Sequence, residues 1–167
     1  MQYIYIICAF GGFYIYVTEG FPLLPNERVG YVHVYSGTLL MITCYTSYFM
    51  ACWVDPGCIN KNSDKALKIS ALKRFKFDEV IFEAKCECRT CAFEKPARSK
   101  HCPICKTCVE KFDHHCVWIN QCVGLYNYRY FLGFLFTHAL ICTYGLIIGY
   151  QIMMAVVDRE GLWDTEF

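Results

Sequence analysis

Ten cysteine and histidine side chains crowd into one stretch of the sequence, between Cys88 and Cys122. Thiolate and imidazole groups are the ligands that zinc prefers, and a zinc ion takes four of them in a tetrahedron. Eight of the ten are regularly spaced, which is enough for two ions: Cys88, Cys91, His101, Cys102, Cys105, Cys108, His115 and Cys122. The spacing therefore predicts two zinc sites, and it leaves His114 and Cys116 unused by metal.

This unused pair lies within Asp113-His114-His115-Cys116. A cysteine thiolate is a strong nucleophile, and a neighbouring imidazole favours the thiolate form. In an extended backbone alternate side chains share a face, so His114 and Cys116 would lie together while His115 points away. A spare thiol beside a spare imidazole indicates an enzyme rather than a plain zinc module.

The whole pattern resembles the cysteine-rich domain of the DHHC protein S-acyltransferases, which are membrane-embedded palmitoyltransferases. The resemblance is dense over residues 86–131. After a first Cys-x2-Cys it reads Lys95-Pro96-x-Arg98-x2-His101-Cys102-x2-Cys105-x2-Cys108-x4-Asp113-His114-His115-Cys116-x-Trp118-x-Asn120-x-Cys122-x-Gly124. Asp55-Pro56-Gly57, directly after an apolar run, resembles the DPG motif of the same family.

The resemblance implies an interleaved set of zinc ligands. One structural Zn²⁺ takes Cys88, Cys91, His101 and Cys108, and the other takes Cys102, Cys105, His115 and Cys122. Adjacent side chains of an extended strand point to opposite sides, which agrees with His101 and Cys102 serving different ions. Cys86 is then a spare thiol beside the first site.

The resemblance also implies the reaction. Cys116 is expected to be the nucleophile, His114 the base, and Asp113 the residue that orients His114. The expected donor is a fatty acyl-CoA, usually palmitoyl-CoA. The expected acceptors are membrane-proximal cysteines of substrate proteins.

Four further residues are candidates for binding the acyl-CoA. Lys95, Arg98 and Lys100 either meet its phosphates or form a solvated basic loop. Trp118 either lines the mouth of an acyl cavity or anchors the membrane interface. The sequence leaves these alternatives open.

Composition places this chemistry in a membrane protein, because 56% of the 167 residues are hydrophobic and 19% are charged. Three stretches contain no Asp, Glu, Lys or Arg: residues 2–18, 31–54 and 131–157. The second and third are long enough to cross a bilayer core of roughly 30 Å, and the first is at the short end. A signal peptide is the alternative for the first stretch, which has no basic leader and no clear cleavage site.

We therefore expect a membrane α-helical protein with three transmembrane helices and a small zinc-stabilised, cysteine-rich cytosolic domain. Asp55-Pro56-Gly57 ends the second helix. Within the following linker, residues 61–77 are expected to form a basic helix, on a membrane surface or in solvent, and residues 77–82 a short strand. The expected parts are 1–54 with two helices and a lumenal turn, 55–85 as linker, 86–130 as zinc domain, 131–157 as third helix and 158–167 as tail.

Charge distribution predicts the orientation in the membrane. Fourteen of the sixteen Lys and Arg residues fall between Asp55 and Tyr130, so the positive-inside rule places that loop in the cytosol. Zinc thiolates agree with a reducing compartment, and the resemblance implies the endoplasmic reticulum or Golgi membrane. The formal net charge of +1 gives no sign of nucleic-acid binding, and the apolar stretches weigh against a nucleic-acid zinc finger.

The sequence departs from the family that it resembles in one respect. That family has four spans and a Thr-Thr-x-Glu motif after the fourth, whereas one span follows the zinc domain here and Asp164-Thr165-Glu166 is a faint echo of the motif. We therefore expect a fragment or a truncated form. Two functions stay open: a protein-cysteine S-palmitoyltransferase, or a catalytically impaired, membrane-tethered zinc module that binds partner proteins.

Overall fold

The computed structural model describes residues 1–161, which divide into two compact units. The cysteine-rich unit comprises residues 1–2 and 48–132, and the helical unit comprises residues 3–47 together with the chain from 133 onward. Asp164-Thr165-Glu166, and with it the end of the expected tail, lies outside the described residues.

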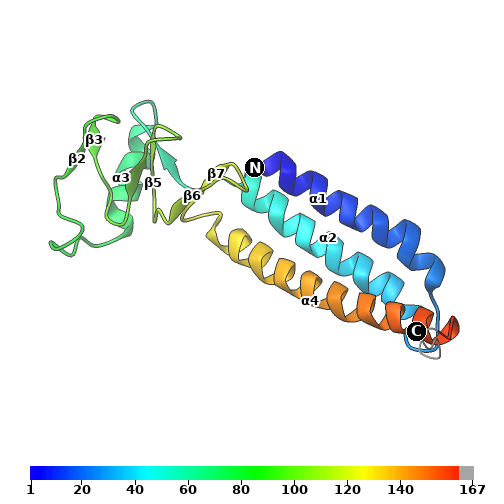
Figure 1. The fold of residues 1–167 in the computed structure, drawn as a ribbon. Coiled ribbons are helices and arrows are strands. Elements are labelled where there is room, and N and C mark those ends of the chain that lie inside the picture. Colours follow the sequence, from blue (N-terminus) through cyan, green and yellow to red (C-terminus); the bar gives the residue numbers. More distant parts are fainter. Residues whose placement is uncertain (162–167) are drawn as a thin grey trace. The chain divides into compact units, whose positions relative to one another are not determined.

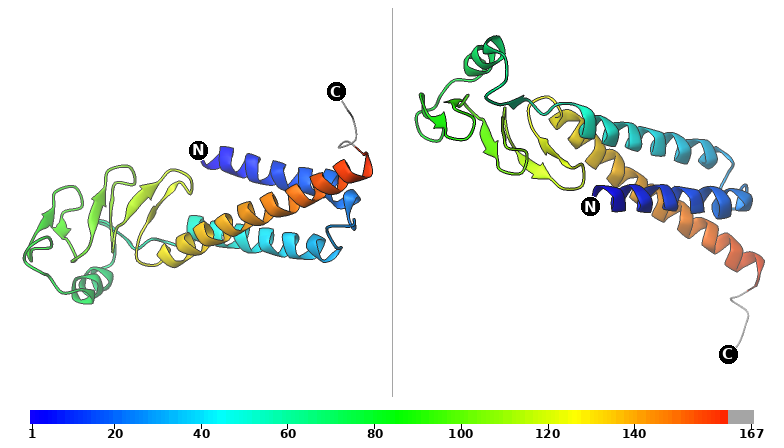
Figure 2. Two further views of the ribbon diagram at one scale, coloured as in Figure 1. Left: turned by 60° about the horizontal axis from the view of Figure 1, so that its bottom comes forward. Right: turned by 90° about the horizontal axis from the view of Figure 1, so that it is seen from above.

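The helical unit is built from α1 (Gln2–Ile15) and the larger parts of α2 (Val32–Trp53) and α4 (Tyr128–Arg159). A π-helical turn, η1 (Tyr16–Gly20), and a 3-10 turn, η2 (Phe21–Leu23), lead the chain out of α1. Aromatic contacts join the helices: the Phe10 and Tyr45 rings stack with centroids 4.5 Å apart, and Tyr5 meets Phe134 edge-on at 5.5 Å. Figures 1 and 2 show these three helices side by side.

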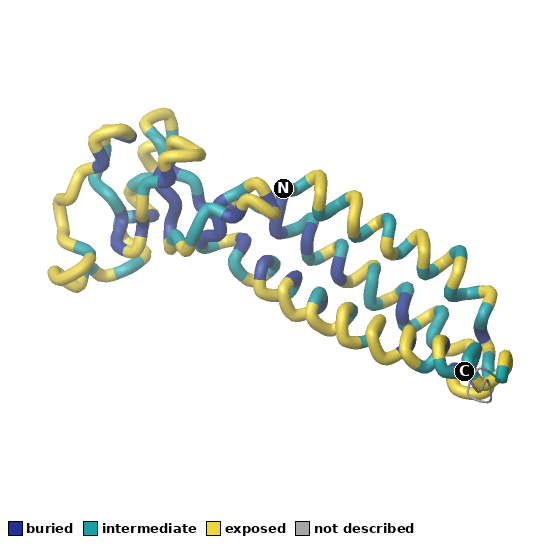
Figure 3. Tube along the Cα trace, viewed as in Figure 1, coloured by how far each residue is buried: buried dark blue, intermediate teal, exposed yellow. Residues whose placement is uncertain are grey.

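In the described part of the chain, two helical segments are long and apolar enough to cross a membrane, Gln2–Leu23 and Tyr128–Arg159. They correspond to the first and third apolar stretches of the sequence. None of the most apolar part of the first segment, and 11% of that of the second, is buried inside the protein. Exposed residues accordingly run along α1 and α4 (Figure 3), so other parts of the described chain do not enclose these helices.

The second apolar stretch forms α2, which does not reach the hydropathy of the other two segments. Its serine and threonine side chains lower the hydropathy, yet each of them donates to the carbonyl four residues earlier at 2.7 to 3.2 Å: Ser36, Thr38, Thr43, Thr46 and Ser47. Such bonds satisfy the hydroxyl groups within the helix itself. The third transmembrane helix therefore stays a prediction.

Three β-hairpins follow one another in the cysteine-rich unit. They pair β2 (Glu87–Cys88) with β3 (Phe93–Glu94), β4 (Lys100–Cys102) with β5 (Thr107–Val109), and β6 (His114–Cys116) with β7 (Gln121–Val123). A further strand, β1 (Cys58–Ile59), pairs antiparallel with β5. Strands this short enclose little apolar volume, and cysteines make up most of the buried clusters: Cys88, Cys91 and Cys108 in one, Cys102, Val109 and Cys122 in the other.

The segment Asp55-Pro56-Gly57 follows the end of α2, as predicted. Asp55 Oδ1 accepts the backbone N–H of Gly57 at 2.6 Å, and Gly57 has a φ of 100°, which favours glycine. A Cβ at Gly124 would clash with the carbonyl oxygen of Pro56. Glycine at both positions therefore lets this turn pack closely against the third hairpin.

The strand expected over residues 77–82 is wrong. Asp78 Oδ1 instead accepts three consecutive backbone N–H groups, from Val80, Ile81 and Phe82, at 3.1, 3.0 and 2.8 Å. Glu79 adopts a φ of 55°, which bends the chain at this point. Because one carboxylate takes all three N–H groups, the segment forms a capped loop rather than a ladder.

The basic helix of the linker forms as α3 (Lys65–Arg74), which is shorter than the predicted range. Ala71 is fully buried, and Arg74 Nε donates to Glu110 Oε2 at 2.9 Å. The Lys68 ammonium lies 5.5 Å from the centre of the Phe93 ring. These contacts pack α3 onto the β-hairpins of its own unit.

Candidate metal centres and active site

Among residues 1–161, two groups of four ligand atoms lie close enough to hold a metal, with all atoms of a group within 4.8 Å of one another. One group consists of Cys88, Cys91, His101 and Cys108, and the other of Cys102, Cys105, His115 and Cys122. The structure thus brings together the same two interleaved sets that the sequence analysis expected.

The spacing within each group fits a tetrahedral zinc ion. Zinc–sulfur bonds of about 2.3 Å and zinc–nitrogen bonds of about 2.0 Å place sulfur about 3.6 Å from nitrogen. In the first group, Nδ1 of the histidine lies 3.4 to 3.9 Å from the three sulfurs. In the second group the same distances are 3.3 to 3.8 Å. Each group can therefore hold one metal through three sulfurs and one nitrogen.

Protonation of the thiols supports the same conclusion. Burial raises the pKa of Cys108 and of Cys122, so these thiols keep their protons unless a cation takes their place. Burial also acts against ionisation at Cys88 and Cys102, but backbone N–H groups two and three residues ahead hold the pKa of both below the ordinary value. Three sulfur atoms and one imidazole nitrogen around one point favour a soft cation.

The three hairpins repeat one layout at fourteen-residue intervals, starting at Cys88, Cys102 and Cys116. Each of these cysteines pairs across the hairpin with the residue five positions later: Phe93, Thr107 and Gln121. The residue before that partner has a φ of 52 or 53° in all three: Ala92, Lys106 and Asn120. The third hairpin therefore has the same backbone layout as the first two.

One position separates the third hairpin from the others. Cys91 and Cys105 complete the Cys-x2-Cys turns of the first two hairpins, and the corresponding residue of the third is Ile119, which is buried. Cys116 consequently has no second cysteine in its turn. The fourteen-residue interval between these hairpins is visible in the sequence, but the prediction from ligand count did not use it.

The strand pairing explains why the ligand sets interleave. His101 pairs with Cys108 across β4 and β5, and His115 pairs with Cys122 across β6 and β7. Each pair joins the turn cysteines of the preceding hairpin. Every metal group therefore ties the turn of one hairpin to the base of the next.

The candidate catalytic residues lie on and beside β6. Because His114 to Cys116 is a strand, His114 and Cys116 share a face and His115 points to the other. His114 Nδ1 lies 3.5 Å from Asp113 Oδ2, and its ring meets Phe131 edge-on at 5.3 Å. Cys116 is buried, whereas the His114 side chain is 44% exposed. The structure thus brings Asp113 and His114 together and places His114 and Cys116 on the same strand.

The candidate acyl-CoA-binding residues fall into three places. Lys95 and Lys100 line a hollow of about 380 Å³ together with Cys86. The Arg98 guanidinium lies over the Phe75 ring instead, 5.7 Å from its centre. Trp118 is half-exposed, and its carbonyl accepts a hydrogen bond from Tyr48 Oη at 3.0 Å.

Sequence reasoning missed a buried carboxylate beside the metal groups. Glu110 is 1% exposed, and its hydrogen bond from Arg74 joins α3 to the residue that follows β5. The Arg74 guanidinium also lies 5.6 Å from the centre of the Tyr126 ring. The available signal was a charged residue directly after the apolar strand Thr107–Val109.

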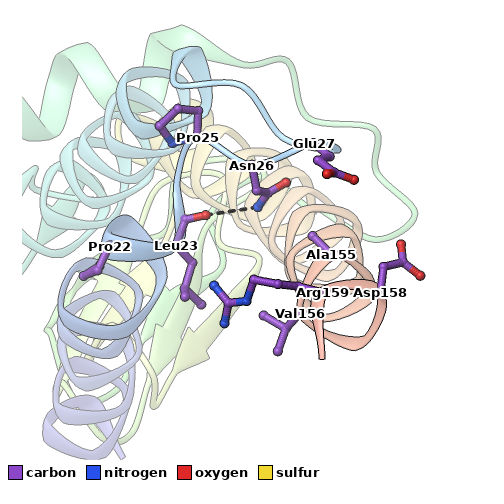
Figure 4. Close-up of a pocket in the computed structure, with 9 residues that line it drawn as sticks. All are labelled: Pro22, Leu23, Pro25, Asn26, Glu27, Ala155, Val156, Asp158 and Arg159. Carbon is purple, nitrogen blue, oxygen red and sulfur yellow. Dashed lines mark hydrogen bonds between the residues drawn. The ribbon is translucent and has the colours of Figure 1, made fainter. Parts of the chain in front are cut away.

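Two hollows of the helical unit contain none of the predicted site residues. One, of about 170 Å³, is lined by Tyr5 and His138, whose Nδ1 lies 3.4 Å from Tyr5 Oη. His138 thus forms a hydrogen bond within the helical unit. The other, of about 360 Å³, lies between the Pro22–Glu27 turn and the end of α4, where Asn26 donates to the Leu23 carbonyl at 3.1 Å (Figure 4).

Comparison with known proteins identifies the family. The model of the DHHC palmitoyltransferase family matches residues 81–166, so the chain belongs to that family. It is 41% identical over 122 residues to palmitoyltransferase ZDHHC4 of Bos taurus, covering 73% of this chain and 34% of the relative. It is 44% identical over 146 residues to palmitoyltransferase swf1 of Schizosaccharomyces pombe, covering 85% and 36%. Palmitoyltransferase SWF1 of Yarrowia lipolytica is 44% identical over 114 residues, covering 68% and 29%. The chain thus spans about a third of the length of these curated relatives.

Proposed function

We propose that the protein is a protein-cysteine S-palmitoyltransferase, which carries a fatty acyl group from acyl-CoA through Cys116 to cysteines of substrate proteins. The observation that carries this proposal is the arrangement on β6. There His114 and Cys116 share one face, while His115 Nδ1 lies 3.3 to 3.8 Å from the sulfurs of the second metal group. Relatives that bear the name palmitoyltransferase support the same activity.

The first step forms an acyl-enzyme. The Cys116 thiolate attacks the thioester carbonyl of acyl-CoA, a carbon–sulfur bond to Cys116 forms, and the bond to the coenzyme sulfur breaks. His114 takes the Cys116 proton at Nε2 and delivers it to the leaving thiolate, which departs as the thiol. Asp113 Oδ2, 3.5 Å from His114 Nδ1, would hold the proton on Nδ1 and so keep Nε2 available as the base.

The second step reverses the first with a protein thiol as acceptor. The substrate cysteine attacks the acyl thioester on Cys116 after His114 removes its proton, and Cys116 leaves and regains a proton. One thioester replaces another in each step, so neither step needs an oxidant, a reductant or water. The same two residues serve both steps.

The two metal groups would hold structural Zn²⁺ ions, one bound by Cys88, Cys91, His101 and Cys108 and one by Cys102, Cys105, His115 and Cys122. Zinc bound by four protein ligands has no open position and contributes folding free energy. The residues of this chain would do the chemistry, and His115, with a metal bound, would fix the strand that presents them.

For the donor we propose that Lys95, Arg98 and Lys100 meet the phosphates of acyl-CoA. Lys95 and Lys100 share one hollow, which suits a group of negative charge. Trp118, half-exposed at the turn of the third hairpin, would line the mouth of the acyl cavity.

We further propose three transmembrane helices, α1, α2 and α4, in an endoplasmic reticulum or Golgi membrane, with residues 55–130 in the cytosol. The internally bonded hydroxyl groups of α2 support its place in lipid. A glycosylation acceptor placed after Phe167 should be modified in microsomes, and one placed near Ser63 should not. The reverse pattern would contradict this orientation.

The activity is tested by incubating the purified protein in detergent with palmitoyl-CoA and a membrane-anchored peptide that contains one cysteine. We expect release of free coenzyme A and transfer of the acyl group to the peptide. If a protein that carries two metals releases no coenzyme A, the tethered zinc module is the better description.

A further inference from the structure

Gln121 stands directly opposite Cys116 in the β6–β7 hairpin. Directly opposed residues of antiparallel strands project to the same face, with Cβ atoms about 4.5 to 5.5 Å apart. Gln121 contributes no ligand to either metal group and belongs to none of the motifs described above. Its side chain is nevertheless the nearest cross-strand neighbour of the proposed nucleophile.

The Gln121 carboxamide reaches back to the C-terminal end of α2. Its Nε2 donates to the Val54 carbonyl at 2.6 Å and to the Ala51 carbonyl at 3.4 Å. Carbonyls at the end of a helix have no partner inside the helix, so side-chain donors satisfy them. Thr107, the equivalent residue of the second hairpin, similarly donates to the Ile59 carbonyl at 3.0 Å.

Two other side chains hold the same hairpin on α2. Tyr48 Oη donates to the Trp118 carbonyl at 3.0 Å, and Asn127 Nδ2 donates to the Ala51 carbonyl at 3.2 Å. Tyr48 and Asn127 are both fully buried. Tyr48 thus fixes the turn of the hairpin, and Asn127 fixes its base. Gln121 makes the remaining contact with α2, at the position opposite Cys116.

We infer that Gln121 is a positioning residue for Cys116, which fixes the nucleophile strand against the end of α2. The inference rests on the proposed transferase function. A displacement of about 1 Å at a reacting group can slow a reaction by about a hundredfold, because the attacking atom leaves its productive geometry. Loss of the Gln121 contact should therefore lower the rate constant of acylation and leave metal binding and folding unchanged.

The test compares three variants by single-turnover acylation with palmitoyl-CoA. Gln121→Met keeps the side-chain volume and loses both donors, and Gln121→Asn keeps the donors on a chain one methylene shorter. Asn62→Ala removes an exposed amide of the same unit as the matched control. Gln121→Met should lower the acylation rate constant about ten- to a hundredfold. The rate constant of Gln121→Asn should lie between those of the parent and Gln121→Met. The rate constant of Asn62→Ala should equal that of the parent.

The amplitude of the reaction separates positioning from a merely structural role. A loss of folded protein lowers the amplitude and the metal content, whereas misplacement of Cys116 lowers the rate constant and leaves both unchanged. The acyl-CoA concentration at half-maximal rate should also stay the same. Equal rate constants in the parent and Gln121→Met would overturn the inference, and so would a fall in amplitude alone.

A second readout does not depend on transferase activity. The rate at which N-ethylmaleimide modifies Cys116, followed by peptide mass spectrometry, should rise several-fold in Gln121→Met because the strand is less firmly held. If the parent forms no acyl adduct, the transferase proposal fails and this labelling decides the inference alone. Unchanged labelling then overturns it, and faster labelling with both metals retained supports it.

Discussion

Cys102 and Cys116 occupy equivalent positions in two successive hairpins, fourteen residues apart. Cys105 lies three residues after Cys102 and belongs to the same metal group. The corresponding residue, three positions after Cys116, is the buried Ile119. The hairpin of the proposed nucleophile is thus a metal-binding turn that lacks its second cysteine. A thiol that must attack a substrate has to stay free of metal, and an apolar residue at position 119 meets that need.

Ile119→Cys should turn the third hairpin into a dithiol turn like the other two. Phenylarsine oxide, which bridges two close thiols, should then block acylation, and a small dithiol should restore it. Ile119→Val is the matched control, because it shrinks the same buried side chain without adding a thiol. Equal sensitivity of the two variants to the arsenical would show that position 119 does not face Cys116 as the repeat implies.

The two adjacent histidines should respond in opposite ways to removal. His115→Ala should lose one metal and loosen the third hairpin, because His115 Nδ1 lies 3.3 Å from Cys105 Sγ in the second metal group. His114→Ala should keep both metals and slow acylation by about a hundredfold or more, the usual contribution of a general base. Zinc analysis and single-turnover acylation kinetics of the two variants test these expectations. Metal loss in His114→Ala with retention in His115→Ala would reverse the two roles.

Removal of one ligand should weaken the cysteine-rich unit. Cys105→Ala should lower the zinc content from two ions to one per chain and make the unit more sensitive to protease, since structural zinc supports folding. Cys86→Ala is the matched control, because Cys86 is an exposed free thiol outside both groups. A chelator should reproduce the Cys105→Ala effect in the parent. Equal protease resistance of the two variants would argue against a structural metal.

The loop capped by Asp78 should depend on pH. Backbone N–H groups of Phe82, Val80 and Ile81 hold the pKa of Asp78 below its ordinary value. The charged carboxylate therefore favours the loop above the unfolded pKa of about 3.9, and this contribution disappears as the pH falls through the lowered pKa. The amide resonances of residues 80–82 should shift together at low pH, and Asp78→Asn should abolish that shift. Independent titration of the three amides would contradict the shared cap.

The residues that could bind metal were predictable from the sequence, because residue types and spacings identify them. Eight regularly spaced sulfur and imidazole groups are enough for two tetrahedral sites, so the number of sites needed no tertiary information. The division of these ligands into one set with His101 and one with His115 was implied by the resemblance to the DHHC family. The ends of the apolar helices were close to those predicted. Charge-free stretches are bounded by Pro, Gly and charged residues, as at Asp55-Pro56-Gly57.

Features that depend on tertiary contact could not be predicted in this way. Gln121 and Asn127 are ordinary amides in the sequence, and they gain a role only where the third hairpin meets the end of α2. The strand expected at residues 77–82 does not form. The Asp78 carboxylate competed for the same N–H groups and prevailed.

Cys116 is the residue that we propose to carry the acyl group. The most direct test of this proposal is mass spectrometry of the protein after brief exposure to palmitoyl-CoA, with the peptide that contains Cys116 separated from the peptide that contains Cys86. We predict one hydroxylamine-sensitive acyl group on Cys116, absent from Cys116→Ala, which should still bind two metals because Cys116 belongs to neither group. An adduct that persists in Cys116→Ala, or the absence of any adduct from a folded protein with two metals, would contradict the account.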